Sequence, residues 1–231
     1  MSLLTIVDNV SRELKLGAVS SVVNNADENV RALLAAAKRE GKHLVVRASL
    51  QALIEEATHT TIADEDQGDI GTIAPGFDRF VPETQWNRTT LLPLRGPVDG
   101  IEWQQIKARD SSAVTPYFRL RGDRLLIYPA PTAGHTIAFE YFSKLWVKAQ
   151  DGTLKDDFTD DEDTPRFKES IIELGVIWRF KEDSGLDYAE KKRDYEIALK
   201  NATLTDNAER IVLGRGARRA HRSDYRITGA P

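Results

Sequence analysis

Residues 167–180 read FKESIIELGVIWRF, and this stretch decides the fold because it is apolar on nearly every side of a helix. A helix without a polar face has to be enclosed by other parts of the protein. We therefore expect a central, buried helix that begins at Pro165 and ends at Gly185. Its large apolar residues are Ile171, Ile172, Leu174, Val176, Ile177, Trp178 and Phe180.

Further helices are predicted on both sides of this stretch. After it, Tyr188, Tyr195 and Leu199 fall on one face of an amphipathic segment. Before it, apolar residues at helical spacing predict three helices, over residues 3–14, 25–41 and 46–57. Helices joined by short connections pack as an antiparallel bundle. We expect such a bundle to be built in two parts, from residues 1–68 and residues 151–204.

The middle of the chain has the period of two that is typical of strands. In YFRLRGDRLLIYPAP, residues 117–131, alternating segments flank Gly122 and Asp123, a pair suited to a hairpin turn. The segment TIAFEYFSKLWV, residues 136–147, alternates in the same way. The sequence thus predicts an α+β fold, a helical bundle with an inserted antiparallel β module, residues 69–150, and an extended C-terminal arm, residues 205–231.

An acidic stretch, DDFTDDED at residues 156–163, precedes the central helix. Its spacing does not fit an EF-hand calcium loop, because a loop starting at Asp157 has Glu162 at the sixth position, where glycine is needed. A looser calcium site stays open. The stretch fits better as a helix approach, with Asp163 or Thr164 as the N-cap of the central helix and acidic side chains near its positive end. We expect Phe158, alone among acids, to anchor the stretch in the core.

Several classes of chemistry find no support in the sequence. The chain has no cysteine, which excludes disulfides and thiolate metal sites. Its four histidines are far apart, and no metalloprotease, serine-hydrolase or phosphate-loop motif occurs. We therefore expect no cofactor and no metal. No targeting or membrane-spanning segment is recognised either, so synthesis in the cytoplasm and no membrane partner are expected.

The C-terminal segment differs from the rest of the chain in charge. Residues 210–231 hold six arginines and one acid, a charge of +5 in a chain of net charge −4, which leaves −9 for residues 1–209. Such a segment can bind nucleic acid, dock on an acidic protein surface, or stay solvated. Two apolar residues among the arginines favour docking. The predicted partner-binding residues are Arg210, Arg215, Arg218, Arg219, Arg222, Tyr225, Arg226 and Ile227.

A family resemblance is carried by several of these stretches in a fixed order. They are APGFDRFVPETQWNRT, LRGPVDGIEWQQIKARD, YFRLRGDRLLIYPAP, IAFEYFSKLWV, DDFTDDEDTPRF and ELGVIWRFKEDSGLDYAEKKRDYEIAL. Over residues 1–204 the chain resembles the head-to-tail adaptor, or connector, proteins of tailed bacteriophages, which include podovirus tail tubular and tail accessory proteins. Two positions depart from the family pattern: Gly76 and Arg166 stand where acids are common.

The resemblance implies a virion protein at the head–tail junction that is not an enzyme. Such adaptors form a ring, usually of twelve copies, beneath the portal protein. The ring extends the DNA channel, through which the genome passes without sequence-specific binding, and offers a platform to the next tail or nozzle protein. An extended C-terminal arm, here residues 205–231, reaches the portal.

Two other functions stay open at this point. One is a tail-associated cell-wall hydrolase that uses a pair of carboxylates, for which Asp160, Asp161 and Asp163 are the best candidates. The other is a DNA-binding module that acts through the arginine-rich arm.

Overall fold

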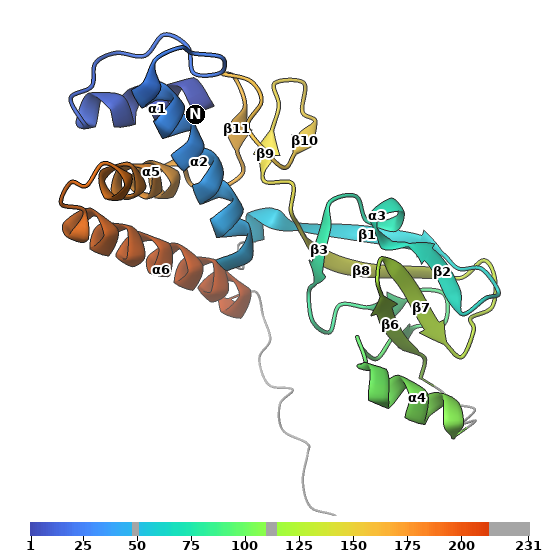
Figure 1. Ribbon diagram of the computed structural model, residues 1–231. Coiled ribbons are helices and arrows are strands. Elements are labelled where there is room, and N and C mark those ends of the chain that lie inside the picture. Colours follow the sequence, from blue (N-terminus) through green and yellow to red (C-terminus); the bar gives the residue numbers. More distant parts are fainter. Residues whose placement is uncertain (48–50, 110–114, 213–231) are drawn as a thin grey trace, which may run out of the picture.

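The structure is a computed structural model that describes residues 1–47, 51–109 and 115–212, and for residues 205–212 only the backbone. It has a helical part and a β module that lie end to end (Figure 1). The helices pack as a bundle and the strands form antiparallel sheets, so the fold is α+β, as the sequence predicts.

Four helices form the helical part, with α5 at its centre in contact with the three others. Ile172 and Val176 of α5 are fully buried, which confirms the predicted central helix. Gly185, with a φ of +68°, follows its C-terminus, also as predicted. The four helices are α1 (Leu3–Glu13), α2 (Glu28–Arg47), α5 (Glu169–Asp183) and α6 (Ala189–Val212).

The helix predicted to end at Gly41 continues to Arg47. Gly41 serves packing instead of ending the helix, because a Cβ atom at this position would lie only 2.1 Å from the indole of Trp146. The glycine therefore lets the loop that carries Trp146 approach α2 closely.

The predicted helix over residues 46–57 is wrong. After α2 the chain forms a short 3-10 helix, η1 (Gln51–Leu53), and then strand β1 (Ile54–Thr60). β1 pairs along its whole length with β8 (Thr136–Ser143), for example Ala57 with Phe139. Pairing with a distant strand and the β-branched residues of this segment outweigh the apolar spacing that suggested a helix.

The β module consists of antiparallel sheets that pack around aromatic residues. Phe80 contacts both Phe118 and Phe139 edge to face, with ring centroids 5.1 Å apart in each pair. The main sheet has the order β1-β8-β4-β5, with β3 also paired to β8, and a second sheet has the order β2-β7-β6. The further strands are β2 (Asp66–Asp69), β3 (Phe77–Phe80), β4 (Trp86–Asn87), β5 (Leu92–Pro93), β6 (Tyr117–Arg121) and β7 (Arg124–Tyr128).

The hairpin predicted around Gly122 and Asp123 is confirmed as β6 and β7, with Arg121 paired to Arg124 across the turn. Two helices in the module were not predicted, the short α3 (Ile70–Ile73) and α4 (Gly100–Ala108). Strands β1 and β2 also place the start of the module before the predicted boundary at residue 69.

A third, small sheet packs on the helices, with Val147 in the core of the helical part. It has the order β10-β9-β11, with β9 (Val147–Lys148), β10 (Leu154–Lys155) and β11 (Thr164–Pro165). The prediction that α5 begins at Pro165 is therefore wrong, because Thr164 and Pro165 pair with β9 and α5 begins at Glu169. Lys168 is its N-cap residue and makes no side-chain capping bond.

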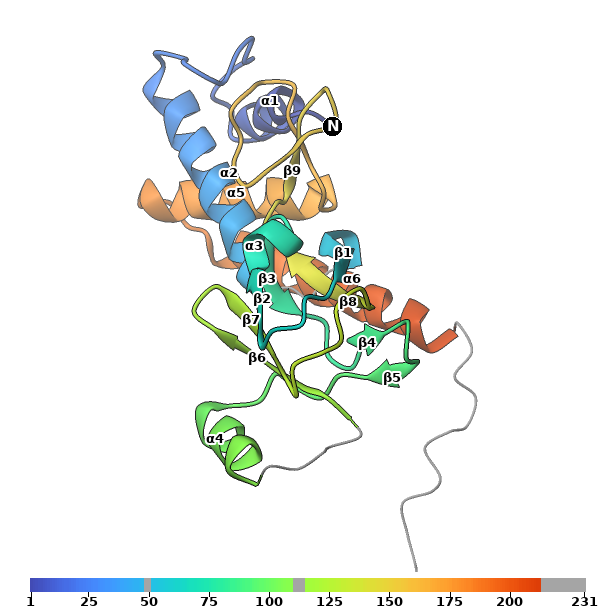
Figure 2. The ribbon, with the colours of Figure 1, turned by 90° about the vertical axis from the view of Figure 1, so that its right-hand side faces the viewer.

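The C-terminal helix is longer than expected. The apolar period fades near residue 204, but α6 continues to Val212, so the first part of the predicted arm is helical. Both ribbon views show α6 running from the level of α5 towards the level of the β module, where it ends (Figures 1 and 2).

Candidate docking surfaces

Of the predicted partner-binding residues, only Arg210 belongs to a described element, the last turns of α6. The other predicted residues lie outside the described residues, and they are Arg215, Arg218, Arg219, Arg222, Tyr225, Arg226 and Ile227. Their role as a docking segment stays a prediction.

The acidic stretch caps the N-terminus of a helix, but that helix is α1 and not α5. The backbone carbonyls of Asp163 and Asp161 accept hydrogen bonds from the first N–H groups of α1, those of Leu3 at 2.7 Å and Leu4 at 3.0 Å. The predicted capping of α5 by Asp163 or Thr164 is therefore wrong. The predicted anchor is confirmed, because Phe158 is fully buried and packs edge to face on Trp146 at 4.7 Å.

Asp163 organises the acidic stretch from within. Its side chain is 1% exposed and pairs with the ammonium of Lys155 at 2.6 Å. Its Oδ2 atom also accepts hydrogen bonds from the backbone N–H groups of Thr159 and Asp160. Burial by itself raises the pKa of Asp163, but the ammonium and the N–H donors outweigh it, so the pKa lies below the ordinary value.

The other acids of the stretch hold neighbouring segments. The Asp161 carboxylate accepts from the backbone N–H groups of Val22 and Val23, the latter at 2.7 Å. Asp157 pairs with Lys42 of α2 at 3.0 Å. The carboxylates that were candidates for hydrolytic chemistry thus have structural partners. Among residues 1–47, 51–109 and 115–212, no group of three or more histidine and acidic side chains is arranged to hold a metal.

A buried polar cluster lies between α2, α5 and α6. The fully buried carboxylate of Glu40 accepts from Arg179 Nε at 2.7 Å and from the Tyr195 hydroxyl at 2.5 Å. Gly175 gives this carboxylate its space, because a Cβ atom there would lie 2.5 Å from Glu40. Burial and the neighbouring Glu40 raise the pKa of Tyr195. The cluster is enclosed, so it fixes helix packing and offers no surface to a partner.

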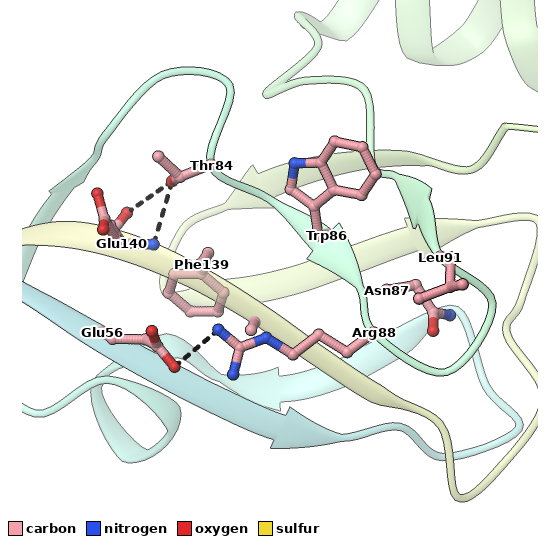
Figure 3. A pocket seen from close by; sticks show the side chains of 9 residues that line it. Glu56, Thr84, Trp86, Asn87, Arg88, Leu91, Phe139 and Glu140 are labelled. Atoms are coloured by element: carbon pink, nitrogen blue, oxygen red, sulfur yellow. Dashed lines mark hydrogen bonds and ion pairs between the residues drawn. The ribbon is translucent and has the colours of Figure 1, made fainter. Parts of the chain in front are cut away.

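The outer face of the main sheet carries an open groove of about 300 Å³ (Figure 3). Trp86 of β4 is 45% exposed and Leu91, in the turn to β5, is 76% exposed. The pairing of Trp86 with Ala138 fixes the indole on this face. The groove is lined by Glu56, Thr84, Trp86, Asn87, Arg88, Leu91, Ala138, Phe139 and Glu140.

The charges in the groove do not balance. Glu56 and Glu140 are direct partners across β1 and β8, so two carboxylates project from the same face of the sheet. Arg88 pairs with Glu56 at 2.9 Å. For the Glu140 carboxylate, the described residues supply no hydrogen bond or ion pair. Only the backbone atoms of Glu140 make hydrogen bonds, among them with the Thr84 hydroxyl and with the Val81 N–H. One negative charge therefore remains in the same groove as an exposed indole.

Sequence reasoning missed this groove. Trp86 looks like any aromatic of a β module, and Glu56 was assigned to a helix, so nothing in the sequence placed it opposite Glu140. The available signal was local: TQWNRTT, residues 84–90, sets one tryptophan among polar residues. A tryptophan in such a setting has few apolar neighbours to cover it.

Comparison with known proteins supports the family resemblance that the sequence carries. No helix in the described part of the chain is long and apolar enough to span a bilayer. A search among curated proteins finds none that matches this chain. Residues 1–225 match the family described as SU10 adaptor protein, which covers the helical part, the β module and most of the arginine-rich segment. The chain therefore belongs to the SU10 adaptor protein family, and the resemblance to phage head-to-tail adaptors is confirmed.

Proposed function

We propose that this phage adaptor works as a structural protein of the head–tail junction. In this proposal twelve copies form a ring under the portal protein, extend the DNA channel and present a platform to the next tail or nozzle protein. The family match over residues 1–225 is the observation that carries the proposal. The genome passes the ring without sequence-specific contacts, and no catalysis is involved.

The distribution of charge supports an arm that docks on a different polypeptide. A segment of charge +5 follows a body of charge −9. Opposite charges on two surfaces guide encounter and fix the register in which the surfaces meet. Arginine is suited to this task because its planar guanidinium pairs with carboxylates in a bidentate manner. The proposed contact is made by Arg210, Arg215, Arg218, Arg219, Arg222, Tyr225, Arg226 and Ile227 on the portal or on a neighbouring subunit.

The acidic body also suits the wall of a DNA channel, because like charges keep the genome from adhering. A ring further needs interfaces between unlike surfaces of neighbouring copies that close on themselves. The tightly packed helical part, with α5 enclosed by three helices, provides a rigid unit for such repetition.

The test is a truncation after Val212, which keeps the whole of α6. The truncated protein should fold, with the circular dichroism spectrum of the full chain, and should no longer join purified portal protein in a light-scattering measurement of mass. Normal joining by the truncated protein would refute the docking role of the arm. If the truncated protein still forms a complex of normal mass with portal protein, and the full chain binds DNA strongly and in a salt-dependent way, the DNA-binding alternative would be favoured instead.

A further inference from the structure

We propose that the groove on the outer face of the main sheet is the receptor for the part of the chain's own arginine-rich segment that follows α6, residues 213–231, in the free protein. The occupant is an arginine side chain with apolar neighbours. It lies on the face of Trp86 and pairs with the carboxylate of Glu140. The proposal concerns the protein before assembly and does not depend on the proposed function.

The first argument is the cross-strand pair of carboxylates. Glu56 and Glu140 face each other on β1 and β8, and like charges directly opposite on a sheet destabilise it. The single cation of the groove, Arg88, pairs with Glu56. A second cation at Glu140 would remove the remaining repulsion, so the groove favours a cationic occupant.

The second argument is the exposed indole of Trp86, which lines the same groove as this carboxylate. A guanidinium placed over a tryptophan face gains a cation–π interaction, and tryptophan is the best aromatic partner for it. Leu91, which also lines the groove, adds exposed apolar surface. Figure 3 shows the Trp86 indole and Leu91 standing on the same side of the sheet as Arg88. The groove thus combines one unpaired carboxylate with exposed apolar area. A planar guanidinium can pair with the carboxylate and cover the apolar area, whereas the compact ammonium of a lysine covers little of it.

The third argument is the length of chain that follows α6. The 19 residues after Val212 can span roughly 60 Å when extended. A compact chain of 231 residues has a radius of gyration of only about 17 Å. Because α6 ends at the level of the β module (Figures 1 and 2), the segment can reach the groove of its own molecule. Tethering then favours this intramolecular contact over a contact with a second copy, since it acts as a high local concentration.

Within the segment, Arg226 fits the groove best. It stands between Tyr225 and Ile227, whereas Arg215 stands between Gly214 and Gly216. An arginine with large apolar neighbours covers apolar surface that an arginine between glycines leaves in water. The groove should therefore discriminate between these two arginines, although their charge is the same.

Trp86 is a built-in reporter for the test. The three other tryptophans, Trp103, Trp146 and Trp178, are between 1% and 6% exposed, whereas Trp86 is 45% exposed. Quenching of fluorescence by acrylamide therefore reports mainly on Trp86. We expect weaker quenching in the full chain than in the chain truncated after Val212, and no such difference in a pair of proteins that both carry Trp86→Phe. Equal quenching of the full and truncated chains would overturn the proposal.

Protein concentration separates the chain's own segment from that of a second copy. Protection of Trp86 should be the same at 1 µM and at 100 µM, with a monomer mass in light scattering at both concentrations. Protection that grows with concentration along with the mass would overturn the intramolecular contact and assign the groove to a second copy.

A peptide of residues 213–231, added to the truncated protein, tests the chemistry of the site. Its binding, followed by the anisotropy of a label on the peptide, should weaken about tenfold with Glu140→Gln, the weight of one charge-assisted hydrogen bond. Glu102→Gln, which removes the same charge from the exposed start of α4, is the matched control and should change little. Arg226→Ala in the peptide should weaken binding more than Arg215→Ala. Equal effects of Glu140→Gln and Glu102→Gln would overturn the assignment of the site.

These measurements use no portal protein. A failure of the arm to join the portal would leave the protection of Trp86 unchanged, and a failure of protection would leave portal joining unchanged. The two proposals can therefore fail separately.

Discussion

Asp163 shows how one side chain connects three segments of the helical part. It lies in the acidic stretch, pairs with Lys155 of β10 and accepts from two backbone N–H groups. Its own carbonyl receives the first N–H of α1. A buried carboxylate with this many donors is expected to stay ionised and to hold the stretch in one conformation.

We predict that Asp163→Asn lowers the free energy of unfolding by roughly 2 kcal/mol or more at pH 7, because it leaves the Lys155 ammonium without its counter-charge. Urea unfolding followed by circular dichroism measures the change. Asp160→Asn in the same stretch is the control, since the Asp160 carboxylate is exposed and, within the described part of the chain, accepts a hydrogen bond only from the Glu162 N–H. A loss in Asp160→Asn as large as in Asp163→Asn would contradict the assignment.

The same pair of proteins should differ in its dependence on pH. The pKa of Asp163 lies below its value in the unfolded chain. The stabilisation is therefore fully present above the unfolded pKa, about 3.9, and is lost as pH falls through the lower folded pKa. The stability difference between the parent protein and Asp163→Asn should be constant from pH 7 to about pH 5 and shrink below pH 4. A difference that grows on acidification would contradict this sign.

At the scale of elements, α4 owes its start to one residue. The Asp99 carboxylate accepts from the backbone N–H groups of Ile101 and Glu102, both at 2.8 Å. The helix then buries Trp103 and Ile106 against the β module. An N-cap of this kind supplies acceptors for N–H groups that have no partner within the helix.

We predict that Asp99→Ala costs about 1 kcal/mol of stability, whereas Asp99→Asn costs much less because asparagine caps almost as well. Equilibrium unfolding of the three proteins in urea makes the comparison. Equal losses in the alanine and asparagine variants would show that charge, and not the capping acceptor, is what matters at this position.

Elements with local signals could be predicted from the sequence, and elements made by distant pairing could not. The enclosed α5 and the hairpin of β6 and β7 follow from apolar pattern and turn residues that lie within the elements themselves. β1 depends on β8, a strand far along the chain, and its own sequence resembles a helix in apolar spacing. The short β11 was mistaken for the start of α5 because Thr164 and Pro165 also suit a helix N-terminus.

The candidate site divides in the same way. The arginine-rich segment is visible in composition alone, so its residues could be named from the sequence. The groove requires β1, β4 and β8 side by side, and the repulsion between Glu56 and Glu140 exists only once their register is set. No local pattern contains that register, and for this reason the receptor was missed while its proposed occupant was found.

At the scale of the whole molecule, the helical part and the β module share a tightly packed junction. Trp146 fits against Gly41 of α2, and Arg166 binds both Glu55 of β1 and the carbonyl of Leu145. The apolar core of the helical part also includes Phe142 of β8. Such sharing of core residues favours a single cooperative unit.

We predict that the body unfolds in one transition. Two variants each keep a single tryptophan, either Trp178 in the helical core or Trp103 in the β module. In each variant, urea unfolding followed by tryptophan fluorescence should give the same midpoint as urea unfolding followed by circular dichroism. Two separate midpoints within one variant, one by fluorescence and one by circular dichroism, would show that the two parts unfold independently.

The pairing of β1 with β8 has a mechanical consequence. Both strands run from the junction with the helical part into the β module (Figure 1), and they are paired with each other from Ile54 and Phe142 to Thr60 and Thr136. One strand between two bodies acts as a hinge, whereas two bonded strands share a load and oppose bending and torsion. A force applied to the far end of the β module is therefore transmitted through the paired strands to α2 and Trp146. The molecule should rotate as a rigid body before it bends at the junction of its two parts.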